Sequence, residues 1–114
     1  MALGIDRQDG ESGVSVIALR GKLMLGEDCV QLETVIPELL AEGRTKLIFD
    51  LSGVTHIDST GIGRFIDTYS RLMKVSGKMR MAGATGAVRD SFRVTRLDTV
   101  FAFFPTVEEA RAGL

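Results

Sequence analysis

Residues 47–63 have the sequence LIFDLSGVTHIDSTGIG, in which an apolar segment gives way to a polar segment that contains glycine. Residues 46–51 are mostly apolar, which predicts a β-strand in the centre of a sheet. Residues 52–57 are expected to form a loop or a short strand. A helix is expected to begin near Ser59 or Thr60, because the apolar residues that follow repeat at the spacing of one helical face. These residues are Ile62, Phe65, Ile66, Tyr69, Leu72 and Met73.

The sequence on both sides of this stretch alternates between expected strands and helices. A β-hairpin is expected in the first part of the chain, with its turn at residues 9–13. Residues 21–26 are expected to be a connector bounded by glycines. Strands that alternate with helices pair in parallel, whereas the two strands of the hairpin pair antiparallel. The prediction is therefore a mixed sheet with helices packed on it. The other expected elements are helices at residues 32–40, around residues 88–92 and after Thr106, and strands at residues 14–19, 78–82 and 100–104.

The length of 114 residues predicts one domain, spanning residues 1–114. Hydrophobic residues make up 45% of the chain and charged residues 25%, which excludes a disordered or fibrous protein. No apolar run approaches the roughly 18 residues that a membrane span needs. The first residues lack the basic and apolar pattern of a signal peptide. We therefore expect a cytoplasmic protein without membrane insertion.

The chain has one cysteine, Cys29, and one histidine, His56, so neither an internal disulfide nor a metal or cofactor site is expected. The net charge of −1 is uneven, with −4 in residues 1–57 and +3 in residues 58–114. The basic residues of the second half are scattered and lack interleaved aromatic residues. This favours a solvated face over direct binding of nucleic acid. They include Arg71, Lys74, Lys78, Arg80, Arg89, Arg93 and Arg96.

Residues 56–63 concentrate short polar residues and glycines where a strand leads into a helix. Asp58 or Ser59 can cap that helix. Gly61 and Gly63 are poor helix formers and indicate either close approach of another group or tight packing of the helix. Known catalytic patterns fit this segment poorly. It lacks the third glycine of a dinucleotide-binding fingerprint and the first glycine of a nucleophile elbow. An aspartic protease needs two carboxylates that share a proton, and its fold does not match the helix-rich pattern expected here. No enzymatic activity is expected.

Residues 47–63, the expected hairpin, residues 19–23 (LRGKL) and residues 83–88 (GATGAV) resemble bacterial anti-sigma factor antagonists, which are single STAS domains. The resemblance implies an α/β domain with a mixed sheet of four or five strands, an N-terminal hairpin and about four packed α-helices. It also implies that Ser59 is phosphorylated by a partner anti-sigma factor that is a serine kinase. A PP2C-type phosphatase would remove the phosphate. The unphosphorylated form would bind the anti-sigma factor and free the sigma factor.

The chain departs from the family at Gly21-Lys22-Leu23-Met24, where many members have Gly-Glu-Leu-Asp. We expect this connector and the start of the helix to form one partner-binding surface. Its expected residues are Leu23, Met24, Leu25, Asp58, Ser59, Thr60, Gly61, Ile62 and Gly63. The alternative function is that of an accessory STAS subunit that docks in a lipid or solute transport system. A small hydrolase is disfavoured, because no general base is placed to serve Ser59.

Overall fold

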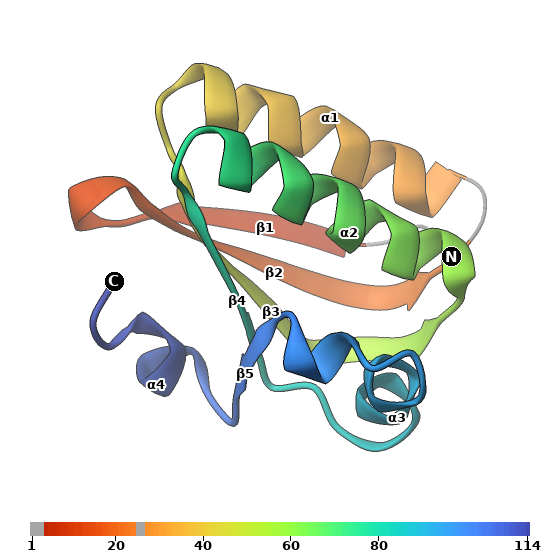
Figure 1. The fold of residues 1–114 in the computed structure, drawn as a ribbon. Helices are drawn as coiled ribbons and strands as arrows, with labels where there is room; N and C mark the ends of the chain where they lie inside the picture. Colours follow the sequence, from red (N-terminus) through yellow and green to blue (C-terminus); the bar gives the residue numbers. More distant parts are fainter. Residues whose placement is uncertain (1–3, 25–26) are drawn as a thin grey trace.

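The computed structural model describes residues 4–24 and 27–114, including all their side chains except those of residues 27–30. Within these residues the chain forms one five-stranded sheet in the order β1-β2-β3-β4-β5 (Figure 1). The strands are β1 (Gly4–Asp9), β2 (Val14–Leu23), β3 (Lys46–Ile57), β4 (Lys78–Ala82) and β5 (Ala102–Phe104). The α-helices are α1 (Glu27–Ala41), α2 (Ser59–Lys74), α3 (Gly86–Val94) and α4 (Val107–Arg111).

The predicted mixed α/β sheet is confirmed. Strand β1 pairs antiparallel with β2 as a hairpin, and the β2–β3, β3–β4 and β4–β5 pairs are parallel. Strand β3 is the central strand, as its apolar sequence indicates. The helix expected after Thr106 is also present, and Thr106 caps it, since the Thr106 hydroxyl accepts a hydrogen bond from the Glu109 N–H at 3.2 Å.

Alternation along the strands divides the interior into two layers. Odd-numbered residues of β2 and β3, such as Ile17 and Phe49, belong to the main core beneath α1, α2 and α3. Before the register shifts in the β2–β3 pair, even-numbered residues such as Val16 and Ile48 face the opposite side, where Ala110 of α4 packs. Helices α1 and α2 lie side by side over the sheet in Figure 1.

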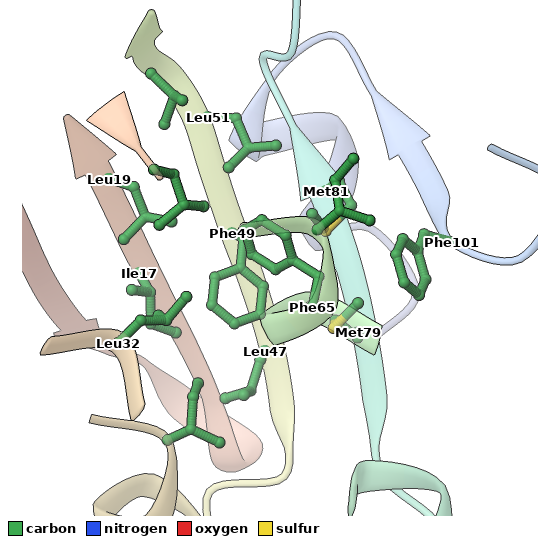
Figure 2. Close-up of a cluster of buried hydrophobic side chains, with 14 of the residues drawn as sticks. Ile17, Leu19, Leu32, Leu47, Phe49, Leu51, Phe65, Met79, Met81 and Phe101 are labelled. Atoms are coloured by element: carbon green, nitrogen blue, oxygen red, sulfur yellow. The ribbon is translucent and has the colours of Figure 1, made fainter. Parts of the chain in front are cut away.

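Aromatic contacts fix α2 and α3 to the main core. The rings of Phe49 on β3 and Phe65 on α2 meet edge to face with centroids 5.1 Å apart. Figure 2 shows these two side chains at the centre of the buried cluster. Phe65 is in turn 5.9 Å from Phe92 of α3. Each such pair adds about 0.5–1.5 kcal/mol beyond the burial of its apolar area, so α2 is held firmly against the sheet.

Strands β2 and β3 are longer than the sequence predicted. Residues 52–57, expected as a loop or a short strand, continue β3, and residues 21–23 of the expected connector continue β2. The extension pairs Lys22 with His56 and Leu23 with Ile57, which supplies hydrogen-bond partners to backbone groups on both strands. Register shifts between residues 18 and 22 accommodate the lengthened pair.

The last strand is shorter than the sequence predicted. Strand β5 contains Ala102–Phe104, and the chain before it forms a 3₁₀ turn at Leu97–Thr99. Phe101 is nevertheless buried, and its ring lies 5.3 Å from that of Tyr69 on α2. Only residues 102–104 of this apolar run therefore form a strand, whereas Phe101 reaches the core from the segment just before it.

Candidate functional site

The candidate site lies where β3 passes into α2. The N-cap of α2 is Asp58, whose backbone is extended with φ −116° and ψ −175°. Its carboxylate Oδ1 accepts a hydrogen bond from the Gly61 N–H at 3.0 Å, and its carbonyl accepts one from the Ile62 N–H at 3.0 Å. An N-cap aspartate satisfies a backbone donor that the helix itself cannot pair. Asp58 therefore acts as the helix cap.

Ser59 is the first residue of α2, and its side chain is exposed. Two neighbours hold its backbone in place. The Asp58 N–H donates to the Leu23 carbonyl at 3.3 Å, which ties the start of the helix to the end of β2. Nearly two turns further along, Phe65 anchors α2 in the core. The Ser59 hydroxyl is thus presented to solvent from a rigid support.

Three residues of the expected partner surface are buried instead. Leu23 has no exposed area, Gly61 is buried, and Ile62 is only 9% exposed. A Cβ atom on Gly61 would lie 2.3 Å from the Leu23 carbonyl oxygen. The group that approaches this glycine closely is therefore the chain's own second strand. The prediction that these three residues face a partner is corrected, because the extended β2–β3 pairing places them inside the fold.

The remaining residues of the expected surface differ in exposure. Ser59 and Gly63 are exposed, and a Cβ atom on Gly63 would meet nothing within 4 Å. Asp58, Thr60 and Met24 are half-buried. Leu25 lies outside the residues that the structure describes. The part of the surface that a partner can reach thus centres on Ser59 and the exposed side of α2.

The exposed side of α2 continues beyond the residues that the sequence singled out. Positions 59, 63, 66, 70 and 73 fall within one narrow angular range of a helix with 3.6 residues per turn. Ile66 and Met73 on this line are 47% and 46% exposed, although their spacing predicted burial. Gly63 and Ser70 on the same line are also exposed. We call these five residues the α2 stripe; it is uncharged along its whole length.

The charged residues of α2 lie on a different side of the helix from the α2 stripe. Arg64 forms an ion pair with Glu33 of α1, and Arg71 pairs with Asp67 one turn earlier on its own helix. The helical spacing of Ile66 and Met73 in the sequence is the feature from which this stripe could have been predicted. The apolar face of α2 spans more positions than the sheet beneath it can cover.

The described residues contain no group of three or more histidine, cysteine, aspartate or glutamate side chains placed to hold a metal ion. His56 is exposed, and its Nδ1 lies 2.9 Å from the Thr55 hydroxyl. None of the helices in the described ranges has the length and apolar character needed to cross a bilayer.

The site and the five-stranded sheet together define a STAS-type domain. The STAS domain family model matches residues 8–110, and the chain belongs to this family. The anti-sigma-F factor antagonist RsfB of Mycobacterium tuberculosis is 28% identical over 103 residues, covering 90% of this chain and 83% of that protein. The anti-sigma-B factor antagonist of Bacillus subtilis is 26% identical over 100 residues, covering 88% and 89%.

A solved structure extends the similarity to three dimensions. The crystal structure of an anti-sigma factor antagonist from Mycobacterium paratuberculosis superposes with a TM-score of 0.84 at 29% sequence identity. The match covers 96% of this chain and 91% of that one. The expected fold class is thereby confirmed over nearly the whole length of both proteins.

Proposed function

We propose that this protein is an anti-sigma factor antagonist controlled by phosphorylation of Ser59. In the unphosphorylated form it binds an anti-sigma factor that is also a serine kinase, and so frees the sigma factor. The observation that carries this proposal is the exposed hydroxyl of Ser59 on the first residue of α2. The two curated relatives, both named as anti-sigma factor antagonists, support it.

The geometry explains how a phosphate would act as a switch. A phosphoryl group adds about −1.5 to −2 charges at neutral pH. A partner packed on the uncharged α2 stripe would have to desolvate that charge without a nearby cation from this helix to offset it. Arg64 and Arg71 are already paired, and Lys74 lies at the opposite end of the helix from Ser59. Phosphorylation is therefore expected to block the interface directly.

The proposal includes two classes of partner and a cellular setting. The kinase is the anti-sigma factor itself, and a PP2C-type phosphatase restores the binding form by removing the phosphate. The protein acts in the cytoplasm as a binding partner rather than as an enzyme. Lys22 on β2 pairs with His56 shortly before the site, and half-buried Met24 directly follows this strand; with these residues in place of the family's usual Glu and Asp, the partner meets a less acidic connector.

Phosphorylation by the cognate anti-sigma kinase tests the assignment of the acceptor. With ATP, Ser59→Ala should abolish labelling, because it removes the acceptor hydroxyl. Ser70→Ala is the control, because Ser70 is an exposed serine on the same helix. Mass spectrometry of the labelled peptide gives the position. Stoichiometric labelling of the Ser59→Ala variant, mapped to Thr60, would contradict the assignment.

The affinity for the anti-sigma factor tests whether a negative charge at Ser59 blocks the interface. Ser59→Asp should weaken the complex by about 2–5 kcal/mol, because it buries an unpaired charge in the interface. This corresponds to roughly 30-fold to several thousandfold in affinity, measured by calorimetry. Ser12→Asp is the charge-matched control, since Ser12 is exposed in the turn before β2, at the other end of the strands. Affinities of the two variants within twofold of each other would rule out an interface at Ser59.

A further inference from the structure

The outer edge of β1 is a sheet edge with which no other strand pairs in residues 4–24 and 27–114. Strand β1 is the first in the sheet order and lies beside β2 alone in those ranges (Figure 1). Its register with β2 is regular from Gly4 to Asp9, without a bulge that would turn the edge away. The strand also contains neither proline nor lysine, two residues that often protect an edge. The edge is therefore open to a further strand.

The pairing with β2 decides which backbone groups of β1 face outward. The Gly10 N–H donates to the Val14 carbonyl at 2.7 Å, and these two residues continue the register in which Asp9 lies opposite Ser15. In an antiparallel pair, hydrogen-bonded and non-hydrogen-bonded residues alternate. Residues 4, 6 and 8 therefore direct their N–H and C=O groups toward β2, whereas residues 5, 7 and 9 direct theirs toward the open edge.

A groove of about 420 Å³ lies between β1 and α1. Its floor is apolar, since Ile5 and Val35 are half-buried and pack against the main core. Arg7 at its wall is already neutralised by Asp9 and Glu42. Side chains of a strand added to β1 would alternate, and those on the helix side would enter this groove. The lining residues are Ile5, Arg7, Gln31, Thr34, Val35 and Glu38.

The groove opens on the side of α1 that is remote from α2. Glu33 of α1 faces α2, where it pairs with Arg64. Gln31, Val35 and Glu38 line the groove, and they fall on the other side of α1 at 3.6 residues per turn. A partner in the groove would therefore leave the α2 stripe accessible.

The charge around the groove is negative. Helix α1 contains no lysine or arginine. Glu33 pairs with Arg64 and Glu42 pairs with Arg7, but no ion pair forms at the exposed Glu38 in the described ranges. An acidic rim beside an apolar floor is complementary to a segment with basic and apolar side chains. A second copy of this chain fits less well, because pairing of two β1 edges through residues 5, 7 and 9 would place two acidic α1 helices on the same face of the sheet.

We propose that the open edge of β1 binds an extended segment of a protein partner, which joins the sheet antiparallel to β1. The outward N–H and C=O groups of residues 5, 7 and 9 hydrogen-bond with the backbone of this segment. An apolar side chain of the segment packs on Ile5 and Val35. A basic side chain two residues away, on the same face of the added strand, pairs with Glu38. The proposal does not depend on the function proposed for Ser59.

Titration of the ¹⁵N-labelled full chain with the peptide acetyl-Thr-Thr-Ile-Thr-Lys-Thr-Thr-amide tests the proposal. Isoleucine and lysine lie on one face of the extended peptide, and threonine favours the extended conformation. Saturable shifts are expected at the backbone amide resonances of Ile5 and Arg7 and of residues 34–38.

Two matched peptides separate the contributions of charge and backbone pairing. The peptide with glutamate in place of lysine should bind about threefold or more weakly, because it repels Glu38. The second peptide has N-methyl groups on the isoleucine and lysine amides, which face β1 in antiparallel pairing. It should bind about tenfold or more weakly, because it keeps the side chains but cannot donate these hydrogen bonds.

Two glutamate variants decide whether Glu38 selects the basic side chain. Glu38→Gln should lower the affinity for the lysine peptide about threefold, since it removes the charge at the groove. Glu108→Gln removes the same charge from an exposed position on α4, which packs on the other face of the sheet, and should leave the affinity unchanged. Circular dichroism checks that both variants fold.

Four results would overturn the proposal. The first is the absence of saturable shifts at Ile5 and Arg7 in the wild type. The second is equal affinity for the N-methylated peptide, which would mean that no strand is added. The third is an equal loss of affinity in the Glu38 and Glu108 variants, which would mean that the peptide senses only net charge. The fourth is a dimer of the free chain in sedimentation equilibrium that the lysine peptide dissociates, which would assign the edge to a second copy.

Discussion

Gly61 and Gly63 look alike in the sequence but have different roles in the structure. Gly61 is buried against the carbonyl of Leu23, and this carbonyl also accepts the Asp58 N–H. Any movement that made room for a side chain at position 61 would therefore disturb the cap of α2 as well. Gly63, two residues later, faces open space. Only the first glycine is required by the packing of this chain.

Substitution of each glycine by alanine separates these roles. Gly61→Ala should lower the free energy of unfolding by roughly 2–3 kcal/mol, because overpacking exceeds the gain in helix propensity. Gly63→Ala should raise it by up to about 1 kcal/mol, because alanine favours the helix and meets no neighbour. Urea unfolding measures both. Equal effects of the two substitutions would contradict the close contact between Leu23 and Gly61.

Helix α2 combines a rigid body with an exposed first residue. Its cap and its core residues hold it to β2 and β3, whereas Ser59 makes no contact on which the helix depends in the described geometry. A phosphate there meets two opposing effects. The helix dipole favours the anion, but the Asp58 carboxylate next to it repels the anion and already accepts the Gly61 N–H. The two effects should nearly offset each other.

Phosphorylated protein should therefore keep its helices. We expect an unchanged far-ultraviolet circular dichroism spectrum and a melting temperature shifted by no more than a few degrees. Phosphorylation should shift the melting temperature of the Asp58→Asn variant upward relative to the shift that it causes in the wild type. The reason is that the variant lacks the negative charge next to the phosphate, while asparagine still caps the helix. Loss of helical signal on phosphorylation would instead indicate an order–disorder switch.

At the scale of the whole molecule, a polar cluster ties the hairpin to the end of α1. Arg7 on β1 contacts Asp9 at 2.8 Å and Glu42, just after α1, at 2.7 Å. The hydrogen bonds from Arg7 hold the pKa of the Asp9 and Glu42 carboxyls below their usual values. Asp9 also accepts from the Ser15 hydroxyl at 3.0 Å. The cluster joins segments that lie far apart in the sequence at the end of the sheet opposite Ser59.

The lowered pKa values predict how stability depends on pH. A carboxyl whose pKa is lower in the folded state stabilises the fold above its unfolded pKa, and this contribution is lost as the pH falls through the folded value. The wild type should therefore lose stability as the pH falls below about 4. Arg7→Gln should flatten this acid dependence, and melting temperatures over a pH series would measure it.

The control for this prediction is Arg20→Gln. It removes an exposed arginine from the neighbouring strand, where Arg20 pairs with Asp6 across the hairpin. This variant has the same change in net charge but leaves the contacts of Arg7 intact. An acid dependence that is equally flattened in both variants would show that net charge, rather than the Arg7 cluster, controls it.

Features that depend on local chemistry could be predicted from the sequence alone. The spacing of apolar residues in α1 and α2, the turn of the hairpin and the capping threonine of α4 all involve residues close together in the chain. The same holds for the exposed start of α2, because Asp58 and Ser59 are strong capping residues directly after an apolar strand. These local signals placed most of the strands, the helices and Ser59.

The tertiary structure decided which of these residues a partner or ligand can reach. Leu23 and Gly61 looked like surface residues until the extended β2–β3 pairing brought them together. Ile5 and Val35 belong to separate elements, and only the fold brings them together as the floor of the groove beside β1. The physical reason is that burial and exposure depend on contacts between distant segments. Local periodicity carries no information about which distant surfaces will meet.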